Sequence, residues 1–118
     1  MAGIDFSDRS KVLAIIGQGY VGLPLAMAAV DAGWTVIGIE KSTSRVEKLN
    51  SGSSPVEDIS DARLAKAIAA NKFIASNDPA DVSHASVVTI CVPTPLNDAR
   101  EPDLELLESA TKDVAPFL

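Results

Sequence analysis

The sequence has very few of the residues that build disulfides and metal centres. Its 118 residues include one cysteine, Cys91, and one histidine, His84. A single cysteine forms no disulfide within the chain, and one cysteine with one histidine is too few for a zinc site. Cys91 lies in an apolar run with no histidine nearby in sequence to activate it. We therefore predict no metal site and no catalytic residue, with Cys91 a buried small hydrophobe and His84 a cap at a helix end.

Basic clusters and long apolar segments are also lacking. The chain has 10 Lys and Arg against 16 Asp and Glu, a net charge of -6, which argues against a nucleic-acid surface. No apolar run approaches the roughly 20 residues that a membrane helix needs. Residues 1–10 also lack the charged-then-apolar pattern of a signal peptide. We expect a cytoplasmic protein without a membrane segment, and at this length one domain or part of one.

A glycine-rich motif organises the rest of the chain. Residues 17–22, Gly-Gln-Gly-Tyr-Val-Gly, follow the apolar run 12–16 and precede a helical pattern. Glu40 lies 21 residues after Gly19. A strand before the motif, a helix after it and an acidic residue about 20 positions on are the context of a dinucleotide-binding turn. The alternative is an ordinary tight turn and a solvated glutamate.

Each glycine of the motif has a separate expected role. Gly17 allows a sharp turn out of the strand, since it tolerates positive φ. Gly19 leaves room for a pyrophosphate, and Gly22 lets the helix pack closely on the strand. The phosphate is expected to bind the free N–H groups at the helix start, which belong to Tyr20, Val21 and Gly22.

Glu40 favours NAD as the cofactor. It ends the second predicted strand, where a carboxylate accepts the hydroxyls of an adenosine ribose and repels a 2'-phosphate. Lys41 and Arg45 leave NADP open, because a neighbouring cation can accommodate that phosphate.

The apolar periodicity predicts alternating strands and helices. Strands are expected over 11–16, 34–39, 73–76 and 87–92, and helices over 21–32, 43–51, 60–70, 78–83 and 103–114. This alternation predicts an α/β, Rossmann-like doubly wound parallel sheet of about four strands in the order 3-2-1-4. The ligand is expected outside the carboxyl ends of the strands, where the order reverses.

Four strings resemble the N-terminal NAD-binding domain of the UDP-glucose/GDP-mannose dehydrogenase family. They are residues 17–24, 54–60, 92–96 and 100–104, and the likeness runs from about Lys11 to the end. Within the family, the likeness is greatest to bacterial members that oxidise UDP-N-acetylhexosamines such as UDP-N-acetylmannosamine. A related hydroxyacid dehydrogenase is the less favoured alternative, because the Val-Pro-Thr-Pro string at 92–95 speaks against it.

The resemblance implies a reaction and a set of contacts. Family members oxidise C6 of a sugar nucleotide from alcohol to carboxylate with two NAD, through a thiohemiacetal on a cysteine, and so serve polysaccharide biosynthesis. The implied roles are pyrophosphate contacts from Tyr20 and Val21, a ribose contact from Glu40 and a place beside the cofactor for Arg45. The last four residues of the expected cofactor site lie along the nicotinamide half, where Thr94 contacts the cofactor. The complete expected site comprises Gly17, Gln18, Gly19, Tyr20, Val21, Gly22, Glu40, Lys41, Arg45, Val92, Pro93, Thr94 and Pro95.

The chain departs from the family in what it lacks. The family's catalytic cysteine, lysine and aspartate have no counterpart here, and neither do the fifth and sixth strands of its cofactor domain. We therefore expect residues 1–118 to be an incomplete N-terminal domain that binds NAD without turnover, UDP-sugar being bound only by the full-length protein. A stand-alone dinucleotide-sensing module that regulates a partner is the alternative. The exposed edge of a truncated sheet predicts weak homo-oligomerisation.

Overall fold

A four-stranded parallel sheet forms the centre of the molecule. The computed structural model describes Ile4 and residues 6–118. The strands, in the order β3-β2-β1-β4, are β1 Val12–Ile16, β2 Thr35–Ile39, β3 Phe73–Ser76 and β4 Val87–Ile90. Every strand pair is parallel. The predicted Rossmann-like doubly wound sheet and its strand order are confirmed.

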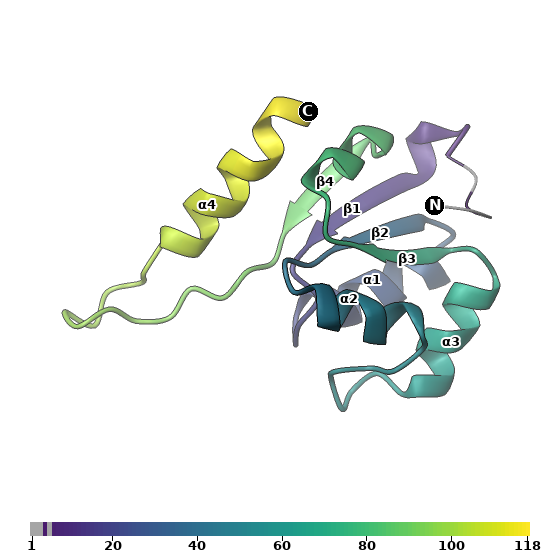
Figure 1. Cartoon of the computed structure of the whole chain (residues 1–118), viewed down its shortest axis with the longest axis horizontal. Helices are drawn as coiled ribbons and strands as arrows, with labels where there is room; N and C mark the ends of the chain where they lie inside the picture. Colours follow the sequence, from purple (N-terminus) through teal and green to yellow (C-terminus); the bar gives the residue numbers. More distant parts are fainter. Residues whose placement is uncertain (1–3, 5) are drawn as a thin grey trace.

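Helices cover both faces of this sheet (Figure 1). The α-helices are α1 Gly22–Asp31, α2 Thr43–Asn50, α3 Asp61–Ala69 and α4 Glu105–Val114. Shorter 3-10 helices are η1 Arg9–Lys11, η2 Pro79–His84 and η3 Ala115–Phe117. Ser42 and Ser60 cap α2 and α3 by accepting backbone N–H bonds, as their positions predict. None of the helices described is long and apolar enough to cross a bilayer.

The strands alternate between two apolar cores. Leu13 and Ile15 of β1 pack against α1, α2 and α3, with Leu23, Leu49 and Leu64 among the buried contacts. The other face, with Ala14 and Ile16, packs instead against η2 and α4. Because both faces are covered, β1 and β2 are buried along their whole length, which explains why Thr35 is the only polar residue in either strand.

The register brings the carboxyl ends of three strands level. Ile16, the last residue of β1, lies opposite Ile39 on one side and Ile90 on the other. The next residues of the three strands, Gly17, Glu40 and Cys91, therefore begin at the same edge of the sheet. This is the edge where the sequence predicts the ligand.

Two predicted boundaries were wrong by two residues. β4 ends at Ile90 rather than Val92, because Cys91 N–H makes the last bond to β1 (2.7 Å, to Ile16 O) before β1 turns away at Gly17. The last helix begins at Glu105 rather than Asp103. Asp103 instead turns the chain into that helix, with its carboxylate accepting the Glu105 N–H at 3.0 Å.

The outer edge of β4 is a candidate surface for self-association. Among the described strands, β4 pairs only with β1, and Val87 at its start is 44% exposed. An uncovered apolar edge favours pairing with a second chain. We expect light scattering to show weak, concentration-dependent association. Val87→Lys should reduce this association. Leu25→Lys, which places a charge at an exposed apolar position on α1, should leave it unchanged. A strictly monomeric wild-type chain at high concentration contradicts this prediction.

Candidate functional site

The turn after β1 is held in a space that admits only glycine. Gly17 has φ +95°, and its N–H donates to Ile39 O at 2.8 Å. A Cβ on Gly17 would lie 2.4 Å from Cys91 O, and one on Gly22 would lie 1.8 Å from Gly17 O. The turn is therefore pressed between the end of β4 and the start of α1, as expected of Gly17 and Gly22.

Above this turn, the start of α1 is open to an incoming anion. The first helical bond runs from Leu23 N–H to Gly19 O (3.1 Å). Within the described chain, the N–H groups of Tyr20, Val21 and Gly22 have no protein acceptor. A Cβ on Gly19 would meet nothing within 4 Å, so the space beside these donors is free. Free N–H groups and the positive end of the helix dipole together can hold a phosphate.

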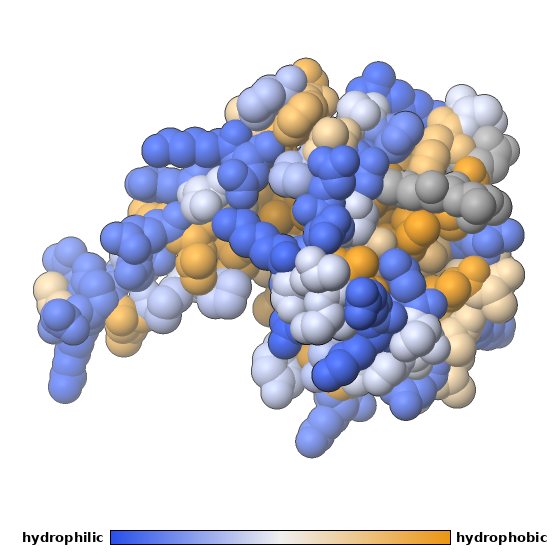
Figure 2. Space-filling view, in the orientation of Figure 1, coloured by the Kyte–Doolittle hydropathy of each residue, from blue (hydrophilic) through white to orange (hydrophobic). Residues whose placement is uncertain are grey.

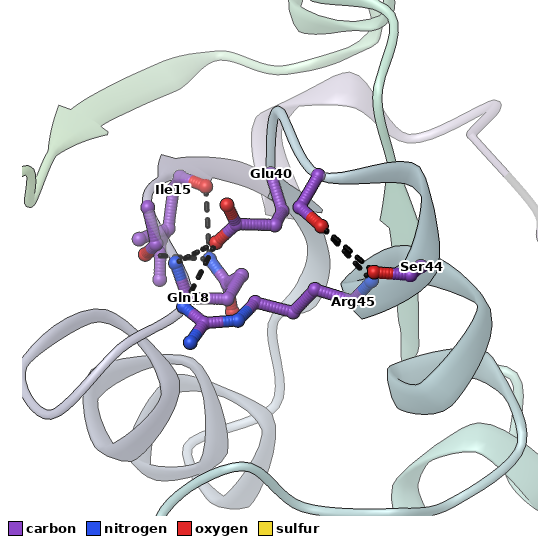
Figure 3. Close-up of polar contacts among 7 residues, drawn as sticks. Ile15, Gln18, Glu40, Ser44 and Arg45 are labelled. Atoms are coloured by element: carbon purple, nitrogen blue, oxygen red, sulfur yellow. Dashed lines mark hydrogen bonds and ion pairs between the residues drawn. The ribbon is translucent and has the colours of Figure 1, made fainter.

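Glu40 is fixed beside this helix start (Figure 3). Its backbone N–H donates to Ser76 O at 2.9 Å, which continues the β2–β3 pairing by one residue. Its carboxylate Oε2 accepts the Gln18 backbone N–H at 3.2 Å and lies 3.7 Å from a guanidinium nitrogen of Arg45. No residue that the structure describes donates a hydrogen bond to the other oxygen, Oε1. Glu40 therefore keeps one oriented acceptor for a ligand hydroxyl.

These groups lie in one cleft of about 710 Å³. The end of the sheet and the glycine turn form its floor, and α4 forms the opposite wall with Leu106 and Ala110. Apolar side chains lie in the recess between α4 and the rest of the molecule (Figure 2). A cleft with apolar walls and a few oriented polar groups is typical of a cofactor site.

The two basic residues near Glu40 already have acidic partners. Lys41 Nζ lies 3.4 Å from the Asp113 carboxylate on α4 and donates to Ser109 Oγ at 3.2 Å. Arg45 pairs with Glu40. The Lys41–Asp113 pair is exposed, so it contributes little to stability, but it links the end of β2 to α4 across the cleft. With both cations paired, the charges in the cleft favour a free ribose hydroxyl over a 2'-phosphate.

Cys91 is partly buried rather than fully buried as expected, and His84 is the last residue of η2. Cys91 lines the cleft, and its partial burial raises the pKa of its thiol, which keeps the sulfur protonated near neutral pH. His84 is on the surface and stacks on Phe6 with ring centroids 4.7 Å apart. The part of the chain that the structure describes holds no cluster of three metal-ligating side chains.

Most of the predicted site residues meet in this cleft. Its lining includes Gly17, Gln18, Gly19, Tyr20, Val21, Glu40, Lys41, Arg45, Val92 and Pro93. Gly22 lies directly beneath Gly17. Thr94 and Pro95 are exposed on the segment that leads away to α4, outside the lining.

Sequence reasoning missed several lining residues. They are Pro55 and Val56 from the loop before α3, Asn77 and Pro79 from the segment after β3, and Leu106, Ala110, Asp113 and Val114 from α4. The helical spacing of residues 104–114 indicated an apolar face on α4, but not what it faces.

Residues 11–118 match the sequence profile of the UDP-glucose/GDP-mannose dehydrogenase family, NAD binding domain. The chain belongs to this family. NAD is accordingly its cofactor, in agreement with the open helix start and the free oxygen of Glu40.

Similar proteins in this family include sugar-nucleotide dehydrogenases from archaea and bacteria. The chain is 35% identical over 107 residues to UDP-N-acetyl-D-mannosamine dehydrogenase from Pyrococcus horikoshii, covering 90% of this chain and 25% of that protein. It is 34% identical over 107 residues to the Escherichia coli K12 protein of the same name, again covering 90% and 25%. The chain therefore spans about a quarter of the length of these relatives.

Solved structures of the family have the same fold. A ternary complex of GDP-mannose dehydrogenase from Pseudomonas aeruginosa superposes with a TM-score of 0.84 at 29% identity, covering 89% of this chain and 24% of that one. The Pyrococcus horikoshii UDP-D-ManNAc dehydrogenase superposes with a TM-score of 0.83 at 33% identity, covering 91% and 26%.

Proposed function

We propose that this chain holds NAD for the oxidation of the C6 alcohol of a UDP-sugar, a UDP-N-acetylhexosamine, to a carboxylate, for polysaccharide biosynthesis. The observation that carries the proposal is the pairing of an unoccupied carboxylate oxygen on Glu40 with the open start of α1 in one cleft. The names of the relatives at 34–35% identity support the substrate class.

Different residues of the cleft bind different parts of the cofactor. The N–H groups of Tyr20 and Val21 bind the pyrophosphate, and Glu40 Oε1 accepts a hydroxyl of the adenosine ribose. Tyr20, which is 78% exposed at the rim, closes over the bound dinucleotide. Val92 and Pro93, which line the cleft, lie along the nicotinamide half. NAD supplies the hydride acceptor, and these residues position it and exclude water from it.

The chain alone binds the cofactor without turnover. Oxidation of an alcohol to a carboxylate requires a base and, for a covalent aldehyde intermediate, a thiolate. Cys91 is the only thiol in the chain, and burial raises its pKa. The carboxylates in the lining of the cleft, Glu40 and Asp113, are each paired with a cation. The residues that perform the oxidation therefore belong to other segments of the complete enzyme.

A calorimetric titration of the purified 118-residue chain tests this proposal. NAD should bind, NADP should bind more weakly, and UDP-sugars should give no heat on their own. No absorbance of reduced NAD should develop when NAD and a UDP-N-acetylhexosamine are both present. Failure to bind NAD would contradict the proposal. Measurable turnover would contradict only the part that assigns catalysis to other segments.

A further inference from the structure

Gln18 lines the cleft, yet it is a fully buried polar residue whose side-chain amide lies against Gly38 of β2. The turn motif does not require a particular residue at this position. Nevertheless, Gln18 is 0% exposed, and its neighbours on this face of the sheet belong to the apolar core. Burying an amide in apolar surroundings is costly unless the amide is hydrogen-bonded, so its partners decide what this side chain does.

The amide of Gln18 ties the glycine turn back to the strand that it leaves. Its Nε2 donates to Ile15 O at 3.0 Å (Figure 3). It also donates to Gly17 O at 3.0 Å. Gly17 O is also the atom against which Gly22 is packed. One side chain therefore satisfies carbonyls on both sides of the point where β1 becomes the turn, and this restricts the direction of the Gln18 backbone.

Gly38 on β2 provides the space for this amide. Gly38 lies opposite Ile15 in the sheet. A Cβ at Gly38 would lie 2.7 Å from Gln18 Cδ, 2.8 Å from its Oε1 and 2.9 Å from Phe73 Cζ. A glycine within a strand weakens the strand and often indicates a close approach by another group. Here that group is the Gln18 side chain.

The fit is not complete, because Gln18 Oε1 is buried without a donor among the described residues. An unsatisfied buried acceptor destabilises the folded state. A purely apolar residue would avoid that cost but would lose both Nε2 bonds. The two Nε2 bonds therefore matter for what they hold in place more than for the stability of the core.

What they hold in place is the backbone N–H of Gln18, which donates to Glu40 Oε2 at 3.2 Å. This bond commits one carboxylate oxygen of Glu40 and leaves Oε1 for a ligand. We propose that Gln18 is a positioning residue: its buried amide, resting on Gly38, directs its N–H at Glu40 and so orients Glu40 toward the adenosine ribose. The inference rests on the proposed function, since it assumes that Glu40 receives that ribose.

The first test is the Gln18→Leu variant, which fills a similar volume without donors. NAD binding by calorimetry should weaken about tenfold, the effect of misplacing one hydrogen bond to a charged group. For a dinucleotide that lacks the adenosine 2'-hydroxyl, the same substitution should reduce the affinity much less than it does for NAD. Gln18→Met, which keeps an unbranched side chain, is the second variant if Gln18→Leu does not fold, as judged by thermal unfolding without cofactor.

The second test separates positioning from general support of the fold. Gln18→Leu combined with Glu40→Ala should bind NAD no more weakly than Glu40→Ala alone, since both changes remove the same contact. Gly38→Ala should lower both the unfolding temperature and NAD affinity. Adding Gln18→Ala should restore part of the unfolding temperature, because it removes the clash with the amide but not the contact with Phe73. It should not restore the affinity.

Two results overturn the inference. One is NAD binding by Gln18→Leu or Gln18→Met at wild-type strength. The other is an equal loss for NAD and for its 2'-deoxy analogue, with full additivity in the double variant. Failure of the wild-type chain to bind NAD is a different outcome, because it rejects the proposed function itself.

Discussion

Gly22→Ala is expected to destabilise the fold by about 3 kcal/mol or more, a large part of the stability of a small domain. The added Cβ would lie 1.8 Å from Gly17 O and 2.8 Å from Gly17 C, both backbone atoms that cannot move without opening the turn. The better helix propensity of alanine recovers only about 1 kcal/mol. Chemical denaturation monitored by circular dichroism measures the loss.

Gly19→Ala is the matched control for this prediction. A Cβ at Gly19 would meet nothing within 4 Å, so the fold should retain its stability. The new methyl group would occupy the space beside the start of α1, so NAD binding should weaken strongly. Two alanine substitutions in one turn should thus separate folding from binding. Equal stability of Gly22→Ala and the wild type would contradict the close-packing role of Gly22.

Glu40→Ala is expected to reduce NAD affinity by about 30-fold, equivalent to about 2 kcal/mol for a lost charged acceptor. The same change should improve NADP binding relative to NAD. Arg45 loses its acidic partner, which lies 3.7 Å away, and becomes available to a 2'-phosphate. Parallel calorimetric titrations with the two cofactors measure both effects.

Glu47→Ala removes the same charge from an exposed position on α2, outside the cleft. Its affinities for NAD and NADP should both match the wild type. If Glu47→Ala shifts the preference as much as Glu40→Ala does, the net charge of the domain, and not contact with the ribose, determines cofactor choice. The Glu40 contact is supported only if the two variants differ.

The candidate site could be predicted where its geometry is local. Gly17 and Gly22 were placed from spacing alone, because a strand that turns directly into a helix leaves no room for a side chain at these positions. Glu40 was placed from its position at the end of the second strand, since parallel strands bring their carboxyl ends to one edge. The family resemblance added the cofactor and the substrate class.

Contacts between distant segments were not predictable in the same way. The spacing of apolar residues predicted the helix α4, but only the structure placed Leu106 and Ala110 across the cleft and paired Lys41 with Asp113. Thr94 was expected against the nicotinamide, whereas the structure places it on the exposed segment before α4. That segment begins where β4 loses its pairing with β1, so local sequence did not determine its course.

The sequence by itself determined the parallel sheet, its strand order, the glycine turn and the acidic residue at the ligand edge. Each depends on residues close in the chain or on strand alternation, which permits few topologies. Only the tertiary structure decided that Gln18 turns inward onto Gly38 and that Glu40 keeps one oxygen free. Those features depend on residues in or just after separate strands, which meet only after the sheet has formed. The bond from the Gln18 backbone N–H then selects one orientation of the Glu40 carboxylate.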